Sequence, residues 1–229
     1  MQRPLLIAVD IEGKVMTILL GLVLPGILLG TSPVSSPRFV PGEVLVKFVP
    51  GSDGGAAVIQ ASRVSPPDLG ALAQVIDRLQ AKVNIPLRAK QVMGGQWVLL
   101  SVGGEKLTDQ LPEKLRGRKN VAGVQPSAGK PEAHANVSLP KKLVIRFSPG
   151  SAESQAVARK LADPNDMGFS HLLRDLEKAV GLPLQGEVDE DATAVVQIDL
   201  AALTLKLSEQ LKALADVESA QPNYILRIQ

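Results

Sequence analysis

The 229-residue sequence contains no cysteine and very few aromatic side chains. Without cysteine there is no disulfide, no thiolate nucleophile and no cysteine-based metal site. Aromatic residues make up only 3% of the chain, so a core has to be built mainly from Leu, Val, Ile and Ala. The formal net charge of +2 is too small to indicate a nucleic-acid partner or an anionic membrane surface. The hydrophobic content of 45% is nevertheless ample for one or two globular domains.

The sequence also lacks the motifs of common catalytic sites. It has neither a Gly-x-Ser-x-Gly elbow nor a Gly-x-x-x-x-Gly-Lys-Ser/Thr loop. We interpret His134 as a solvated linker residue and His171 as a surface residue of a helix. The acidic run at 187–191 could bind a hard cation, but it lacks the spaced ligands of a dedicated loop and is better interpreted as a solvated hairpin tip. We therefore expect no enzyme activity, no metal site and no cofactor.

The N-terminal part resembles a signal sequence. Lys14 precedes an uncharged apolar run at 15–30, which is followed by small and polar residues at 31–37. This order is typical of a signal peptide. A membrane span needs about 20 apolar residues, and Pro25 with Gly26 interrupts this run, so we expect no stable span. Residues 1–37 are interpreted as a signal-like segment and linker, with a short anchor or a buried helix as alternatives. The predicted location is secreted or extracytoplasmic, either free or tethered by an uncleaved segment.

The rest of the chain contains the same pattern twice. The strand-like stretch at 43–51 recurs 99 positions later at 142–150 and ends in Pro-Gly both times. A Pro that follows Ile85 recurs after Leu182, 97 positions on. The leucines of the second predicted helix recur at a spacing of 96: Leu107, Leu111 and Leu115 match Leu203, Leu207 and Leu211. The same proline, Pro-Gly and leucine positions recur at nearly constant spacing, which indicates a duplication.

Each repeat follows the order β-α-β-β-α-β. In the first repeat, residues 52–68 are predicted as a loop with at most one turn of helix, and Gly94-Gly95 as a hairpin turn. Its strands are predicted at 43–51, 87–93, 97–102 and 121–125. Its helices are predicted at 69–83 and 106–116. The fold class is therefore α+β, with two tandem ferredoxin-like domains, each closing its own four-stranded antiparallel sheet with both helices on one face. The predicted domains span 38–127 and 141–229, and a linker spans 128–140.

RNA-recognition domains share this element order, yet RNA binding is not expected. Such domains bind bases through aromatic residues on their central strands. The third strands of the two repeats, 97–102 and 194–199, contain no paired aromatic residues and no basic residues between them. We therefore predict no nucleic-acid partner.

The C-terminal stretch differs most between the repeats. Residues 217–225 are predicted as a closing strand with a turn at Pro222-Asn223, followed by an apolar tail at 226–229. A weaker copy at 121–127 matches only as far as the proline. The part from Asn223 onward is unique to the second repeat.

The ends of the strands resemble the propeptides of subtilisin-type proteases, the inhibitor I9 family. Phe39-Val-Pro-Gly-Glu-Val-Leu-Val-Lys-Phe-Val-Pro-Gly51 is similar to their opening strand. Val217-Glu-Ser-Ala-Gln-Pro-Asn-Tyr-Ile225 is similar to the closing strand that leads into the protease. The Gly-Gly hairpin and the leucine-striped helix are similar as well. The first repeat departs from the pattern at Ser127-Ala-Gly129.

This resemblance implies a non-enzymatic protein that inhibits a subtilisin-like serine protease, or assists its folding, in trans. The open sheet face would pack against the protease, and the tail would lie in its active-site cleft by β-augmentation. The amide oxygens of Gln221 and Asn223 would accept hydrogen bonds from helix N-termini of the protease. Beyond Tyr224, successive subsites of the cleft would bind Leu226, Arg227, Ile228 and Gln229.

Two alternatives stay open on the sequence alone. The first is a ferredoxin-like interaction scaffold with no protease partner. The second is that residues 217–225 are only the last strand and residues 226–229 only its frayed end. No oligomeric state follows from the sequence.

Overall fold

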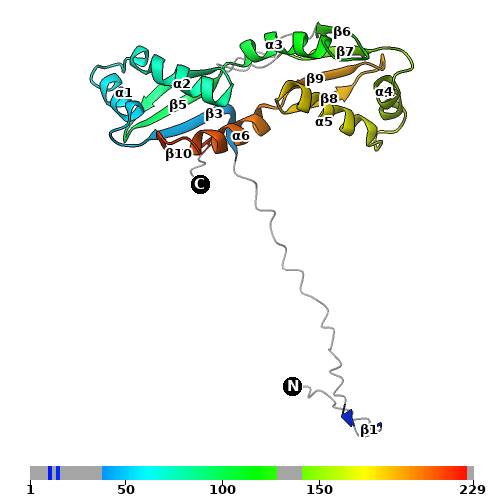
Figure 1. Cartoon of the computed structure of the whole chain (residues 1–229), viewed down its shortest axis with the longest axis horizontal. Helices are drawn as coiled ribbons and strands as arrows, with labels where there is room; N and C mark the ends of the chain where they lie inside the picture. Colours follow the sequence, from blue (N-terminus) through cyan, green and yellow to red (C-terminus); the bar gives the residue numbers. More distant parts are fainter. Residues whose placement is uncertain (1–9, 12–13, 16–37, 128–140, 226–229) are drawn as a thin grey trace. The chain divides into compact units, whose positions relative to one another are not determined.

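The computed structural model describes residues 10–11, 14–15, 38–127 and 141–225 (Figure 1). The chain divides into two units, Met1–Ser36 and Pro37–Gln229. In the first unit, β1 (Asp10–Ile11) pairs antiparallel with β2 (Lys14–Val15). Most of the signal-like segment and the whole predicted linker at 128–140 lie outside the described residues. Within the described part of the chain, no helix is long and apolar enough to cross a membrane.

The second unit is a mixed α+β structure, which confirms the predicted class. Its described residues form two four-stranded antiparallel sheets and six α-helices. The strands are β3 (Phe39–Phe48), β4 (Leu87–Met93), β5 (Trp97–Val102), β6 (Val121–Pro126), β7 (Leu143–Phe147), β8 (Leu184–Val188), β9 (Ala194–Ile198) and β10 (Val217–Tyr224). The helices are α1 (Asp53–Ala61), the 3-10 helix η1 (Leu69–Leu72), α2 (Ala73–Val83), α3 (Gly104–Arg116), α4 (Ala152–Ala162), α5 (Gly168–Val180) and α6 (Leu200–Lys212).

Each sheet combines three strands of one repeat with the last strand of the other repeat. The first sheet has the order β10-β3-β5-β4, and the second sheet has the order β6-β7-β9-β8. Val46 of β3 lies opposite Ala220 of β10, and Ile145 of β7 lies opposite Val124 of β6. Figure 1 shows the exchange as the red strand β10 beside the blue strand β3. The prediction that each repeat closes its own sheet is therefore wrong.

A short connection favours the pairing of β6 with β7. The two strands follow one another in the chain and pair antiparallel, and the backbone N–H of Ser127 donates to the carbonyl oxygen of Lys142 at 2.8 Å. Pairing β6 with β3 of its own repeat would close a much longer loop. Because the entropic cost of loop closure rises with loop length, the nearer strand is favoured. Strand β10 then pairs with the edge of β3 that β6 leaves open.

The exchange divides the second unit at the starts of two helices. Residues 104–198 run without a break through the second sheet and its helices, including α3, which packs against β6 and α5. The first sheet combines residues 39–102 with residues 200–224, and α6 packs against both β3 and β10. The chain crosses at Gly103 and Asp199, one residue before α3 and α6. The second sheet is thus built by a continuous segment and the first by two distant ones.

The connection from helix to strand is the same in both repeats. Gln80 Oε1 accepts from the backbone N–H of Leu87 at 2.9 Å, and Glu177 Oε1 accepts from that of Leu184 at the same distance. The members of the two pairs are 97 positions apart. The helix predicted over 69–83 consists of η1 followed by α2, and it ends at Val83 as predicted. This repeated bond supports the duplication.

The prediction of a loop over residues 52–68 is wrong, because its first part forms α1. Ser52 caps this helix by accepting from the N–H three residues later at 3.1 Å, and Ser151 does the same for α4. Glycine lowers helix propensity, but a Cβ added at Gly54 would lie only 2.2 Å from the Phe48 side chain. Close packing of α1 against β3 therefore requires the residue that makes this helix hard to predict.

Candidate binding site at the C-terminal strand

Strand β10 forms an outer edge of the first sheet and continues through the position of the predicted turn. The predicted turn at Pro222 and Asn223 is wrong, because the strand continues to Tyr224. Pro222 lies opposite Val44 within the pairing. Proline is tolerated here because an edge strand leaves part of its backbone unpaired. The chain therefore stays extended up to the point where the tail begins.

The opening strand β3 bulges where it meets the end of β10. Residues 40–43 of β3 lie opposite the single residue Asn223. Gly42 in this bulge has a φ of 83°, a conformation that favours glycine. Its backbone N–H donates to Thr204 Oγ1 of α6 at 2.6 Å. The bulge thus contacts both the helix and the strand that the second repeat contributes.

A buried carboxylate connects three strands beside this bulge. The side chain of Glu43 is only 4% exposed. Its Oε2 accepts from Asn223 Nδ2 of β10 at 2.6 Å, and its Oε1 accepts from Lys90 Nζ of β4 at 2.5 Å. A buried charge is strongly destabilising unless it is paired and hydrogen-bonded. Glu43 therefore depends on Asn223 and Lys90, and it holds the end of β10 in place.

Three of the predicted binding residues lie in the described part of the chain. Gln221 is exposed. Asn223 donates its amide N–H to Glu43, which leaves Oδ1 as its remaining acceptor. Tyr224 is 39% exposed, and its ring packs edge-on against Phe39 with centroids 6.2 Å apart. The other predicted residues lie outside the described residues: Leu226, Arg227, Ile228 and Gln229.

The face of the first sheet that is turned away from the core carries a short apolar stripe. Leu45 lies opposite Leu99, and Lys47 lies opposite Trp97, so these side chains share one face. Leu45 and Trp97 are half-buried, and Leu99 is buried but lies outside the main core cluster. Gln221 of β10 lies opposite Leu45. The predicted binding strand therefore adjoins this stripe, which we call the open-face stripe (Leu45, Trp97 and Leu99).

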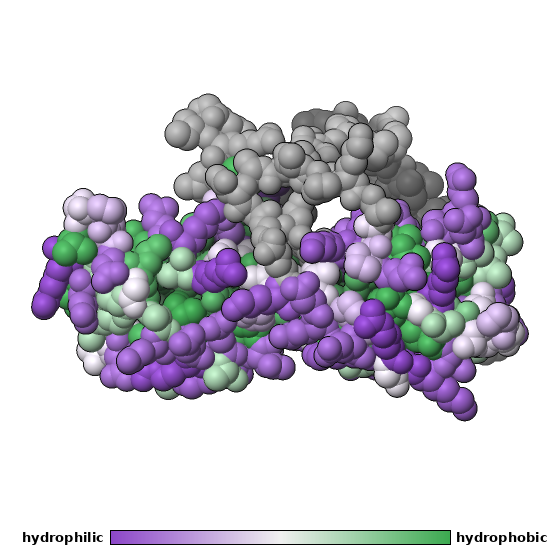
Figure 2. Space-filling model, turned by 90° about the horizontal axis from the view of Figure 1, so that it is seen from above, coloured by the Kyte–Doolittle hydropathy of each residue, from purple (hydrophilic) through white to green (hydrophobic). Residues whose placement is uncertain are grey.

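The corresponding face of the second sheet is more polar. Val144 lies opposite Val195, but Gln185 lies opposite Gln197 and Arg146 is exposed on the same face. On the side of the molecule seen in Figure 2, hydrophobic side chains are scattered among hydrophilic ones. Single exposed apolar residues are normal on protein surfaces. The candidate site therefore consists of the open-face stripe and the neighbouring strand β10.

The acidic run at 187–191 closes a turn between β8 and β9. Asp189 Oδ1 accepts from the backbone N–H of Thr193 at 2.8 Å, and Oδ2 accepts from Thr193 Oγ1 at 2.6 Å. The hydrogen bond from the Thr193 hydroxyl lowers the pKa of Asp189 most, and the hydrogen bond from the Thr193 backbone N–H lowers it further. In residues 38–127 and 141–225, no three His, Cys, Asp or Glu side chains gather as a metal site would require. His171 lies exposed on α5.

Sequence reasoning missed Glu43 and Lys90. Their counterparts in the second repeat, Lys142 and Glu187, also form an ion pair, with an Nζ–Oε1 distance of 3.0 Å and the charges reversed. Those two side chains are 50% and 66% exposed, whereas Glu43 is buried. The reversal of charge is visible in the sequence when the two repeats are aligned. That signal could have identified the pair before the structure.

Comparisons with known protein families, curated proteins and solved structures find no match for this chain. The resemblance to subtilisin propeptides therefore depends on the residues quoted for it, together with the order of the elements. A protease partner stays a prediction.

Proposed function

We propose that this chain is a non-enzymatic protein that binds a subtilisin-like serine protease in trans and inhibits it or assists its folding. The strand exchange carries the proposal. Strand β10 leads into the tail and forms an edge of the same sheet that bears the open-face stripe. A partner that covers this face can therefore also receive the tail. A secreted or extracytoplasmic location belongs to the proposal, because the signal-like segment predicts export.

We interpret each sheet with its helices as a ferredoxin-like unit that is completed by exchange. Such a unit contains its elements in the order β-α-β-β-α-β. In the first sheet, α2 lies between β3 and β4, and α6 precedes β10, which restores this order with elements from both repeats. The second sheet contains the same elements in a circularly permuted order, because α3 and β6 precede β7, α5, β8 and β9 in the chain. Neither unit is complete within a single repeat.

Three contacts fix the direction in which the tail leaves the first sheet. The backbone N–H of Ile225 donates to the carbonyl oxygen of Arg38 at 2.8 Å. Tyr224 packs on the first residue of β3, and Asn223 is hydrogen-bonded to Glu43. A segment that is held in place before binding loses less conformational entropy on binding. This anchoring supports a tail that binds as an extended strand.

The tail would bind by β-augmentation, in which the backbone supplies most of the hydrogen bonds. Gln221 is exposed and Asn223 keeps Oδ1 as an acceptor, so both amide oxygens can accept from helix N-termini of the protease. Four successive subsites of the cleft would take Leu226, Arg227, Ile228 and Gln229.

The exchange also predicts one protease per chain. Strand β6, the counterpart of β10, runs into a hairpin that is closed by the bond between Ser127 and Lys142. The chain that leaves β6 therefore returns to the same sheet at Lys142, where it is hydrogen-bonded. We therefore propose that the binding site is composite, with a face from the first repeat and a tail from the second.

The proposal is tested by measuring inhibition of a subtilisin by the full chain and by a variant that lacks residues 226–229. We expect the truncation to weaken inhibition at least about thirtyfold, because loss of one interface hot spot typically has an effect of that size. Circular dichroism should show an unchanged fold, since the deletion lies beyond β10. Undiminished inhibition by this folded variant would contradict the role of the tail.

A matched pair of substitutions tests the role of the sheet face. Leu45→Lys places a charge in the open-face stripe, and Val144→Lys makes the same change at the corresponding position of the second sheet. We expect Leu45→Lys to weaken inhibition at least about tenfold and Val144→Lys to leave it unchanged. If the full chain inhibits no subtilisin-like protease, the scaffold alternative is favoured instead.

A further inference from the structure

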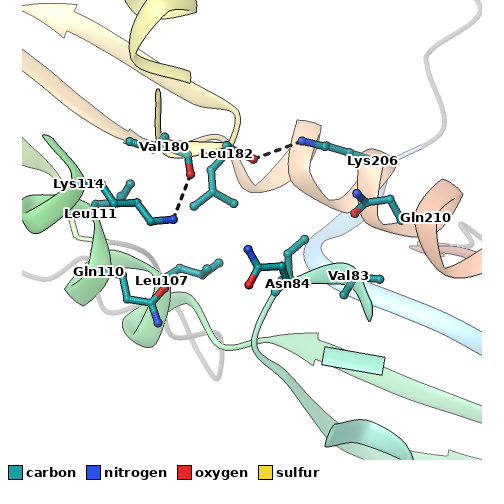
Figure 3. A pocket seen from close by; sticks show the side chains of 12 residues that line it. Val83, Asn84, Leu107, Gln110, Leu111, Lys114, Val180, Leu182, Lys206 and Gln210 are labelled. Carbon is teal, nitrogen blue, oxygen red and sulfur yellow. Dashed lines mark hydrogen bonds between the residues drawn. The ribbon is translucent and has the colours of Figure 1, made fainter. Parts of the chain in front are cut away.

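A cavity of about 100 Å³ lies where the ends of α2 and α5 meet the sides of α3 and α6 (Figure 3). Its floor is aliphatic, and its rim is polar and basic. The floor residues are all buried: Val83, Ile85, Leu107, Leu111, Val180 and Leu182. A pocket with an apolar floor and a few convergent polar groups is typical of small-molecule sites.

The two repeats contribute equivalent positions to the rim, but not equivalent charges. Gln110 of α3 corresponds to Lys206 of α6, and Lys114 corresponds to Gln210, each pair 96 positions apart. Each helix therefore brings one lysine and one glutamine, in opposite order. The result is that both lysines reach the same end of the cavity, beside the C-terminal end of α5 (Figure 3).

The two ammonium groups have hydrogen-bonding capacity to spare. Lys114 Nζ donates to the carbonyl oxygen of Val180 at 3.2 Å, and Lys206 Nζ donates to that of Gly181 at 3.3 Å. An ammonium group has three donors, so each can also donate to a ligand. Among the described residues, no Asp or Glu lines the cavity and neither lysine forms an ion pair. The cavity is therefore positively charged at this end.

At the rim, Gln210 has an acceptor that no described residue satisfies. Its Oε1 is buried and has no hydrogen-bond partner, the only such side-chain atom in the part of the chain that the structure describes. A buried acceptor without a donor destabilises the folded state. A ligand that donates a hydrogen bond to this oxygen would remove that penalty.

We propose that this cavity binds a small organic carboxylate that also carries a hydroxyl or amino group. The carboxylate accepts from Lys114 and Lys206, the hydroxyl or amino group donates to Gln210 Oε1, and the carbon atoms lie on the aliphatic floor. This site does not depend on the proposed protease partner. Because α2, α3, α5 and α6 all line the cavity, the ligand contacts both repeats and stabilises the exchanged arrangement.

The test is a titration of the full chain with sodium lactate, sodium propionate and sodium chloride at equal ionic strength, followed by amide NMR shifts. Lactate should shift the signals of Asn84, Gly181 and Leu182 saturably and raise the melting temperature. Propionate has no hydroxyl group and should bind roughly fivefold more weakly, which is the typical effect of one lost hydrogen bond. Equal effects of all three salts would overturn the proposal.

Substitutions identify the groups that hold the ligand. Lys114→Gln and Lys206→Gln place in each helix the side chain that the other repeat already has, and each should weaken lactate binding at least about tenfold. Lys119→Gln removes an exposed lysine outside the cavity and should leave binding unchanged. Gln210→Leu should abolish the preference for lactate over propionate. Unchanged affinity in both cavity lysine variants, or an unchanged preference in Gln210→Leu, would contradict the assigned contacts.

Discussion

The two outer strands that the repeats exchange look alike in sequence but continue in different ways. Strand β6 turns back into β7 through a hairpin, and it completes a sheet with a polar outer face. Strand β10 runs along the edge of the sheet that bears the open-face stripe and ends at Tyr224, and the next residue, Ile225, is hydrogen-bonded to Arg38. Both strands have the same structural role. We propose that β10, and not β6, leads into a segment that binds a partner, so that the duplication has produced one candidate site.

The largest expected difference between the two halves concerns Gly54. A methyl group added there would lie 2.2 Å from the ring of the buried residue Phe48, and overpacking of this kind typically destabilises by about 1–3 kcal/mol. The second repeat has Glu153 at the corresponding position. Gly54→Ala should therefore lower the urea midpoint of the full chain.

The control for this prediction is Gly123→Ala in β6, where an added Cβ has no atom within 4 Å. Its effect on the free energy of unfolding should stay within about 0.5 kcal/mol. Equal destabilisation by both substitutions would contradict the close packing of α1 against β3.

A smaller difference is expected between the two ion pairs of reversed charge. Glu43→Gln removes the carboxylate from Lys90 and Asn223, and we expect a loss of about 1–2 kcal/mol. Lys90 is 40% exposed and can be hydrated, which keeps the loss below that of a fully buried pair. Lys142→Gln breaks the exposed counterpart, which should change stability by less than about 1 kcal/mol. Urea unfolding distinguishes the two, and equal losses would contradict the special role of Glu43.

The smallest expected effect concerns the turn that Asp189 closes in the second sheet. Its pKa is lowered in the folded state, so its contribution is present above the ordinary value of 3.8 and is lost as the pH falls through the lower folded pKa. Asp189→Asn should destabilise by up to about 1 kcal/mol at neutral pH. The difference from the unmodified chain should disappear in thermal unfolding measured well below pH 3.8. Glu190→Gln, at an exposed position next to Asp189, should show no such pH dependence.

Much of the fold could be predicted because the local signals agree with the structure. Helical spacing of apolar residues predicted α2 and α3, and Gly94-Gly95 predicted the first hairpin. Helix α1 could not be predicted, because glycine has a poor helix propensity. Glycine is needed at position 54 because only a residue without a side chain fits beside Phe48. The strand exchange could not be predicted from the sequence for a different reason. The ends of β6 and β10 share Val, Gln and Pro at equivalent positions, so the sequence pattern alone lets either strand pair with either partner.

The candidate site could be predicted only in part. Gln221, Asn223 and Tyr224 were predicted to bind a partner from the resemblance of the C-terminal stretch, and they lie together at the end of β10, but their binding role stays a prediction. The partner of Asn223 is Glu43, which lies 180 positions earlier, and no local pattern relates the two residues. Their contact exists only because the exchange brings β10 beside β3.

The exchange is tested most directly with pairs of engineered cysteines, because the chain has none of its own. Ser219 of β10 lies opposite Lys47 of β3. If the second repeat closed its own sheet, Ser219 would lie opposite Arg146 instead, as its counterpart Gly123 does. Directly opposite residues of antiparallel strands are close enough for a disulfide.

We expect the double variant Lys47→Cys with Ser219→Cys to form an internal disulfide in monomeric protein, detected by peptide mapping. The double variant Arg146→Cys with Ser219→Cys should stay reduced under the same conditions. A disulfide in the second variant and none in the first would contradict the exchange, and with it the single composite binding site.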